Sequence, residues 1–176
     1  PDILKHIAEE AGGHLIYSKA SSRSLMECAQ KPDVIMAVHD GRFIFPRFHA
    51  GFDGIMAIAQ LASLLEEEQL PLSTLMKAIP AIHLFHETTT CSSALKGTLM
   101  RLLIEKYQNE TLETLDGIKI HQQKGWVLIL PDPVAPKVHL YVNASSQEEG
   151  LHTMKTYRES VTDIIRRCLT GSADAG

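Results

Sequence analysis

Three short apolar segments follow one another late in the chain, at residues 117–121, 126–130 and 137–142, with only short loops between them. The middle segment is apolar throughout, which is typical of a central strand, whereas residues 137–142 alternate apolar and polar side chains, as in a sheet with one wetter face. Strands in such a series favour antiparallel pairing. This part of the chain therefore predicts an antiparallel sheet.

Helical patterns flank these strands. Leucines recur on one side of residues 94–107, and Ser146 with Glu149 forms a capping box that predicts the start of a final helix. An apolar stripe with helical spacing follows the capping box: Leu151, Met154, Tyr157, Val161, Ile164, Ile165 and Cys168. We expect this helix to pack on the sheet. The tail, residues 171–176, has nothing to bury, and we expect it to be disordered.

The first 80 residues alternate helical and strand-like patterns, which is typical of an α/β unit with parallel strands. We expect helices over residues 3–11, after Ser22, from an N-cap at Asp53 to residue 68, and over 72–79. The expected strands are residues 14–17, 34–38 and 42–46. The predicted fold class is α/β in two small units: residues 1–80 form a partial mixed or parallel α/β domain, and residues 81–170 form an α+β domain with an antiparallel sheet.

Composition narrows the classes of partner. Hydrophobic residues make up 44% of the chain and charged residues 22%, as in folded globular proteins. The net charge of −4, with scattered Lys and Arg, argues against nucleic acid. No apolar run approaches the roughly 20 residues of a membrane span, and no signal-peptide pattern is present. We therefore expect a cytoplasmic protein with no membrane partner, and whether it forms a homo-oligomer stays open.

Cysteine and histidine positions give little support for a metal site. The three cysteines, Cys28, Cys91 and Cys168, are far apart, which argues against a disulfide framework and a zinc site and favours a reducing compartment. His83 and His86 stand three apart on an expected strand, so their side chains are expected on opposite faces. Cys91 precedes an expected helix whose dipole can lower a thiol pKa. We nevertheless prefer a structural or capping role for Cys91 to a nucleophilic one.

Two loops have unusual chemistry. Residues 38–42 join two short strands, and ligands in open α/β sheets tend to lie at strand ends. A tight turn at Asp40 and Gly41 explains the same residues equally well. The second loop, residues 130–137, contains three prolines, which lack the N–H groups that a phosphate cradle needs. We therefore expect this second loop to bind phosphate poorly.

The scaffold residues around these loops resemble a known family. They occur in order as Phe52, Asp53, Gly54 and Ile55, then Asp116 and Gly117, then Gly125, Trp126, Val127 and Leu128, then Pro136 and Lys137. From Ile3 to about Arg167, the chain resembles the third and fourth domains of the α-D-phosphohexomutases, which act as phosphomannomutase or phosphoglucomutase. The resemblance implies a phosphosugar as ligand and missing amino-terminal domains as partners. Pro1 in place of an initiator Met likewise indicates an excision from something longer.

The family's functional motifs match less well than the scaffold. Its sugar-binding loop has the pattern Gly, Glu, any residue, Ser, Gly, His, and the residues here are Ala37, Val38, His39, Asp40, Gly41 and Arg42. Its phosphate loop corresponds to Leu130, Pro131, Asp132, Pro133, Val134, Ala135 and Pro136. Lost hydroxyls and an added Asp132 indicate a degenerate phosphate loop. By resemblance, weak substrate contacts are expected from Arg23, His39, Asp40, Gly41, Arg42 and Lys137.

The family's phosphorylated serine and magnesium loop have no counterpart in this sequence. We therefore expect no catalytic residue, metal or cofactor in this chain, with Mg²⁺ bound in the parent enzyme. Three hypotheses follow. The first is a non-catalytic appendage of a bacterial mannose-1-phosphate guanylyltransferase, favoured by residues 96–101 and the degenerate loops. The alternatives are the substrate-clamping half of a phosphomannomutase or phosphoglucomutase, and a stand-alone interaction domain.

Overall fold

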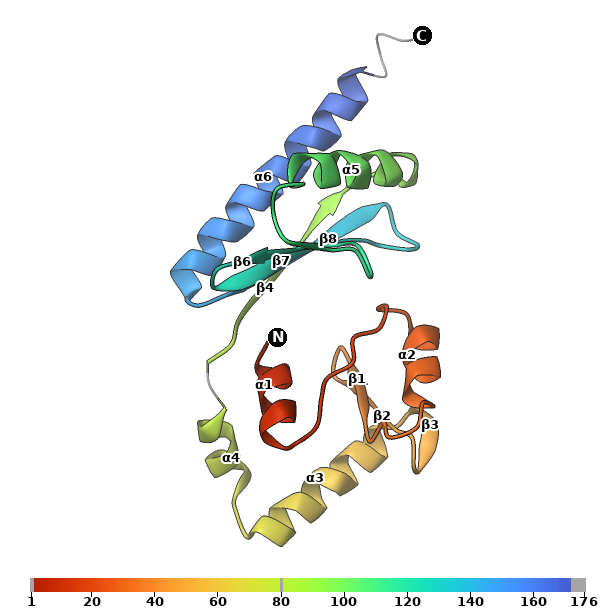
Figure 1. Cartoon of the computed structure of the whole chain (residues 1–176), viewed down its shortest axis with the longest axis vertical. Coiled ribbons are helices and arrows are strands. Elements are labelled where there is room, and N and C mark those ends of the chain that lie inside the picture. The colour runs from red at the N-terminus through yellow and green to blue at the C-terminus, as the bar shows by residue number, and fades with distance from the viewer. Residues whose placement is uncertain (1, 80, 172–176) are drawn as a thin grey trace. The chain divides into compact units, whose positions relative to one another are not determined.

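The computed structural model describes residues 2–79 and 81–171 and confirms a mixed α/β fold with antiparallel sheets and packed helices (Figure 1). Contacts divide these residues into two compact units, one within Ile16–Ala81 and the other comprising residues 2–15 and 82–171. The predicted first domain included residues 1–15, whereas the contacts group residues 2–15 with the second unit. The domain boundary itself stays a prediction.

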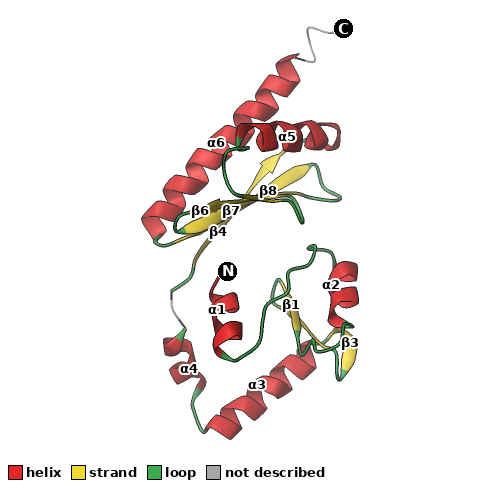
Figure 2. Cartoon of the chain, viewed as in Figure 1, coloured by secondary structure: helices red, strands yellow, loops and turns green. Residues whose placement is uncertain are grey.

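The unit within Ile16–Ala81 contains a small sheet and three helices (Figure 2). Strands β1 (Ala37–His39), β2 (Arg42–Phe45) and β3 (His49–Phe52) pair in that order. The helices are α2 (Ser22–Ala29), α3 (Gly54–Glu68) and α4 (Leu72–Ala78). Both pairings are antiparallel, where we expected parallel strands. The connections explain the difference, because parallel pairing needs a crossover of a dozen or more residues and these strands are joined by short turns.

Residues 14–17 are not a strand, and only the end of the expected strand 34–38 is extended into β1. A strand requires partners for its backbone N–H and C=O groups. Neither residues 14–17 nor residues 34–36 pair with a neighbouring strand in the described chain. Ile16 and Ile35 in these segments are correspondingly exposed, with relative exposures of 52% and 72%.

Side-chain caps fix where the helices of this unit begin. The predicted N-cap Asp53 is confirmed, because its carboxylate accepts a hydrogen bond from Met56 N at 2.8 Å. The cap of α2 is Ser21 rather than the expected Ser22, since the Ser21 hydroxyl accepts from Ser24 N. Asp53 N also donates to Phe43 O, so the cap of α3 is tied to the sheet.

The second unit contains a five-stranded antiparallel sheet in the order β4-β8-β7-β6-β5. The bounds of these strands are His83–Thr90 for β4, Leu112–Glu113 for β5, Ile118–Gln122 for β6, Gly125–Pro131 for β7 and Lys137–Ala144 for β8. The prediction that the continuously apolar strand is central is confirmed, since β7 is the third of the five. Helices α5 (Ser93–Lys106) and α6 (Gln147–Gly171) lie on one face of this sheet (Figure 1). Helix α1 (Asp2–Glu10) is grouped with this unit.

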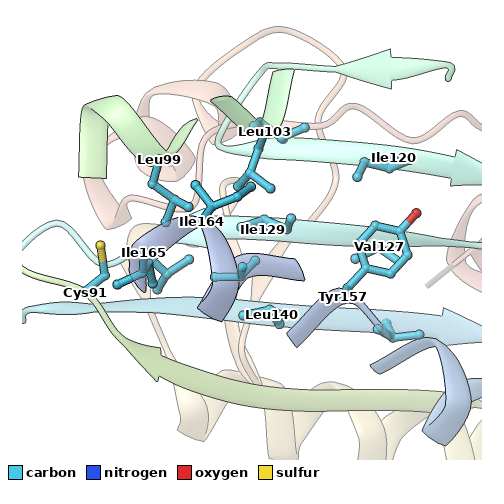
Figure 3. Packing of buried hydrophobic residues seen from close by; sticks show 14 of the residues in the cluster. Cys91, Leu99, Leu103, Ile120, Val127, Ile129, Leu140, Tyr157, Ile164 and Ile165 are labelled. Carbon is cyan, nitrogen blue, oxygen red and sulfur yellow. The ribbon is translucent and has the colours of Figure 1, made fainter. Parts of the chain in front are cut away.

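The core lies between this sheet and the two helices (Figure 3). Leu99 and Leu103 of α5 and Val161 of α6 are fully buried, as are Val127 and Ile129 of the central strand.

The first half of the predicted capping box at the start of α6 is confirmed, because the Ser146 hydroxyl accepts a hydrogen bond from Glu149 N. Gly171 is the last residue of α6, and the rest of the predicted disordered tail lies outside the described residues.

The alternation along β8 determines what the other face of the sheet presents. Val138, Leu140 and Val142 are buried in the core, whereas the residues between them, including His139 and Tyr141, are half-buried on the opposite face. The loop between β7 and β8 therefore leads directly into a strand whose polar side chains face away from the helices.

Among residues 2–79 and 81–171, none of the helices combines the length and apolar character of a membrane span.

Candidate functional site

The β1–β2 hairpin closes with a two-residue turn at Asp40 and Gly41. Both residues have positive φ angles, 50° and 71°, which is the pattern of a type I′ turn, and His39 pairs with Arg42 across it. Glycine adopts this conformation freely and aspartate tolerates it, so the local sequence accounts for the turn. The interpretation of residues 38–42 as a tight turn is confirmed, and a role in sugar binding stays a prediction.

The two arginines predicted to contact a phosphosugar in this unit are both exposed. Arg42 is exposed on β2, and its guanidinium carbon lies 4.7 Å from the centroid of the Phe52 ring. Arg23 lies on α2, where its side chain is 89% exposed and pairs with Glu27 at 2.8 Å. This hydrogen bond and the charge of Glu27 raise the pKa of Arg23. The predicted roles of Arg23 and Arg42 as phosphosugar contacts stay predictions.

The loop between β7 and β8 is ordered around one carboxylate. Asp132 Oδ1 accepts hydrogen bonds from the backbone N–H groups of Val134 at 2.8 Å and Ala135 at 2.6 Å. Its other oxygen, Oδ2, lies 3.0 Å from His139 Nε2 and 3.7 Å from Lys137 Nζ. We expected the prolines to leave this loop short of amide donors. Two amides are nevertheless available between Pro133 and Pro136, and both are directed at Asp132.

These contacts stabilise the ionised form of Asp132. The backbone N–H of Ala135 contributes most, followed by His139 and the N–H of Val134, and together they hold the pKa of Asp132 well below its usual range. The nearby Lys137 adds a smaller effect in the same direction. Asp132 is therefore negatively charged at physiological pH.

A second imidazole extends this cluster across the sheet. His139 Nδ1 lies 2.9 Å from His86 Nε2, and β4 and β8 bring the two residues together because His86 pairs with Tyr141. The His86 ring also stacks on Tyr141, with centroids 4.3 Å apart. If the Nε2–H of His139 donates a hydrogen bond to Asp132, the Nδ1 atom of His139 accepts one from the Nε2–H of His86. Sequence reasoning compared His86 with His83 on its own strand and missed His139.

Lys96 of α5 also stabilises the loop between β7 and β8. Its ammonium donates to the carbonyl oxygens of Asp132 at 2.5 Å and Ala135 at 2.6 Å. The loop backbone is further fixed by bonds from Asp132 N to Lys137 O and from Cys91 N to Pro136 O. The sequence offered no signal for Lys96 beyond its place in the family resemblance. Its ammonium group binds carbonyls of the loop, so in this geometry it is a structural residue.

Cys91 lies in the core, where it is 1% exposed. Burial raises the pKa of its thiol, although the charge of Lys96 opposes that shift. This environment favours the structural role and not the nucleophilic one. Among the described residues, no group of three or more His, Cys, Asp and Glu side chains is arranged to hold a metal ion.

The two candidate elements belong to different units, and each has its own chemistry. The hairpin presents Arg42 and a polar turn, which can bind an anionic or hydroxylated ligand. The β7–β8 loop presents two amides, an imidazole and an ammonium group around Asp132, which is a donor set suited to an oxyanion.

Comparisons with known proteins give one consistent result, although no family model matches the chain. The chain is 29% identical over 170 residues to a probable phosphoglucosamine mutase of Methanopyrus kandleri, and the match covers 95% of this chain and 37% of the relative. A probable phosphoglucosamine mutase of Methanocella arvoryzae is 32% identical over 136 residues, or 76% of this chain and 30% of the relative. A phosphoglucomutase/phosphomannomutase of Thermococcus kodakarensis is 25% identical over 176 residues, which are 97% of this chain and 37% of that relative.

The solved structures show the same fold. A crystal structure of a phosphoglucomutase/phosphomannomutase family protein from Burkholderia thailandensis matches with a TM-score of 0.74 and 19% identity, covering 92% of this chain and 35% of that one. The chain thus spans about a third of the length of the relatives it matches. None of these proteins is named a guanylyltransferase, so the comparisons favour the mutase hypothesis over the guanylyltransferase one. The chain is homologous to one part of the α-D-phosphohexomutases.

Proposed function

We propose that this chain is the substrate-clamping part of a phosphohexomutase-like enzyme and that it binds a phosphorylated sugar without catalysing its conversion. The observation that carries the proposal is the similarity to phosphoglucosamine mutases along 95% of the chain. The names of the relatives point to phosphates of glucosamine, glucose or mannose as ligands. The exposed Arg42 beside the I′ turn supports the proposal, because a guanidinium can form two hydrogen bonds to a phosphate.

Binding is tested by titrating the 176-residue chain with glucosamine 1-phosphate and, separately, with mannose 1-phosphate, while amide resonances are followed by NMR. We expect saturable shifts at His39, Asp40, Gly41 and Arg42 that are lost in Arg42→Ala and weakened in Arg23→Ala. Arg166→Ala is the matched control, because Arg166 is an exposed arginine of α6 that pairs with Asp163 and lies in the other unit.

The outcomes separate the hypotheses. If the hairpin resonances respond to neither sugar phosphate, the clamp proposal is wrong and a stand-alone interaction domain becomes the better interpretation. A response that Arg166→Ala abolishes as fully as Arg42→Ala contradicts specific binding at the hairpin and indicates non-specific charge attraction.

A further inference from the structure

Strand β4 forms one border of the five-stranded sheet, and among the described residues it pairs with β8 alone (Figure 3). Edge strands present backbone groups on which a further strand can be added, and proteins protect them with short strands, lysine, proline or β-bulges. The opposite border, β5, is only two residues long. By contrast, β4 has eight residues, contains neither lysine nor proline, and keeps one register with β8 from His83 to Thr90. β4 is therefore an unprotected edge.

One hydrogen bond determines which backbone groups of β4 point outward. Cys91 N donates to Pro136 O, which continues the register of β4 on β8 and directs the Cys91 amide toward β8. Because backbone groups alternate in direction along a strand, those of Leu84, Thr88 and Thr90 are directed away from β8. No backbone hydrogen bond from another described segment reaches these three residues. They supply donors and acceptors for an additional strand.

The side chains of β4 leave this edge accessible. On one face of the sheet α6 packs against the strand, and Glu87 pairs there with Arg158 at 3.1 Å. On the opposite face Leu84, Thr88 and Thr90 are exposed, with 44% exposure for Leu84. Glu87 is the one residue of β4 among Asp, Glu, Lys and Arg. The charge that an added strand meets is therefore confined to one position.

We propose that β4 is a self-association edge, at which a second copy of this chain adds its own β4 in antiparallel orientation and continues the sheet across a two-fold axis. A two-fold axis brings the same surface of both copies together, so the edge has to be complementary to itself. Antiparallel pairing of one strand with its own copy meets this condition, because each outward N–H group faces a C=O group of the other copy.

The charge of Glu87 selects the register of this pairing. Residues with outward backbone groups pair with one another, and centring the two strands on His86 places Leu84 opposite Thr88 of the second copy. Centring them on Glu87 gives an equally long overlap but places two carboxylates directly opposite each other. Like charges in that position are destabilising. The register centred on His86 is therefore the favoured one.

Sedimentation equilibrium of the full 176-residue chain measures the association. Two paired edges bury less than the roughly 1,200 Å² at the lower end of standard interfaces, so we expect a weak dimer with a dissociation constant on the order of 0.1 mM. Loading concentrations from about 10 μM to about 1 mM cover this range.

Two double variants test the edge and its register together. Leu84→Lys with Thr88→Lys places ammonium groups opposite each other at two positions, and we expect it to weaken association roughly 10-fold or more. The matched control, Leu84→Glu with Thr88→Lys, places a carboxylate opposite an ammonium group and is expected to associate at least as tightly as the wild type. Both variants change exposed side chains only and leave the pairing of β4 with β8 intact. The Lys–Lys variant also brings the net charge of −4 closer to zero, so overall charge repulsion does not explain its weaker association.

Two results would overturn the inference. A wild-type chain that stays monomeric over the whole concentration range leaves the edge to a strand of a different protein. Equal association of the two double variants shows that β4 is not the interface in this register. If the Lys–Lys variant does not fold, Thr88→Pro decides, because proline removes an outward N–H group while Thr88→Val, its control, keeps it. Thr88→Pro must then associate more weakly than Thr88→Val, and equal association contradicts the inference.

Discussion

Asp132 carries a charge that the native loop stabilises, and this makes stability depend on pH. Its pKa is lower in the folded protein than in the unfolded chain, where an aspartate has a pKa of about 3.9. Such a group contributes stability above the unfolded pKa, and the contribution is lost as pH falls toward the folded pKa.

We expect Asp132→Asn to unfold at lower urea concentration than the wild type at pH 7, because the amide loses the charge-assisted bonds to His139 and Lys137. The difference should shrink below about pH 4, where the unfolded wild type takes up its proton. Urea unfolding of both proteins at pH 7, 5 and 3 checks this. Asp163→Asn is the control, since exposed ion pairs contribute about 0–1 kcal/mol. A difference that grows toward acid would contradict the assignment of a stabilised carboxylate.

Gly150 is a second single residue whose identity the packing requires. A Cβ atom at this position would lie 2.0 Å from Cε2 of Phe85, so α6 approaches β4 closely only with glycine there. We expect Gly150→Ala to lower the free energy of unfolding by about 1–3 kcal/mol through overpacking. Gly97→Ala on the exposed side of α5, where a Cβ meets nothing within 4 Å, should instead stabilise by roughly 0.5–1 kcal/mol. Urea unfolding measures both, and equal effects would show that Phe85 moves aside without cost.

Among the elements, β7 lies at the centre of the five-stranded sheet of the second unit. It pairs with β6 on one side and β8 on the other, and its side chains Val127 and Ile129 are fully buried. We expect Ile129→Ala to cost about 2–5 kcal/mol by leaving a cavity. The control, Leu151→Ala on α6, should change stability by no more than about 0.5 kcal/mol, because Leu151 is 54% exposed. Chemical denaturation followed by Trp126 fluorescence checks both, and a loss below 1 kcal/mol for Ile129→Ala would contradict this account of the core.

Elements with local signals were predicted well from the sequence. The Asp53 cap, the capping box at Ser146 and the central position of β7 depend on neighbouring residues or on a continuous apolar run. Segments 14–17 and 34–36 have strand-like composition, yet a strand exists only where a partner lies beside it. The short strands β3 and β5 were missed, because neither contains an apolar run like that of β2.

The positions of the two candidate loops could be predicted from the sequence, but the contacts of their side chains and amides could not. The Asp40–Gly41 turn and the β7–β8 loop were found from residue types and their spacing. The contact of His86 with His139 follows from the register of β4 on β8, which no local pattern specifies. Counting prolines in the loop gave its composition but not the direction of the two amides between Pro133 and Pro136.

At the scale of the whole molecule, the two units differ in how much they bury. The core of the second unit joins its sheet to two helices, whereas Ala29 and Ile44 are the buried hydrophobic residues described in the unit within Ile16–Ala81. Large apolar side chains of that unit are exposed, among them Ile55 at 84% and Ile58 at 72%. Apolar burial is the main source of stability, so we expect this unit to be the less stable one.

Hydrogen exchange of the full chain measures this difference directly. We expect peptides from α3 and β2 to exchange faster than peptides from β7 and β8 at neutral pH. Local opening of the unit within Ile16–Ala81 exposes little additional apolar surface and therefore costs less free energy. The wild-type chain supplies its own control, since both sets of peptides are measured in one experiment. Equal protection would mean that the two units open together.

The stacked rings of His86, Tyr141 and His139 provide a spectroscopic marker of the loop. Circulating π electrons shift the proton resonances of a neighbouring ring that lies above or below their plane. His139 is held in this stack by Asp132 at Nε2 and by His86 at Nδ1, so loss of the Asp132 contact removes one of the two hydrogen bonds that orient the ring and alters the field at Tyr141. The aromatic proton signals of Tyr141 therefore report whether Asp132 contacts His139, without any added label.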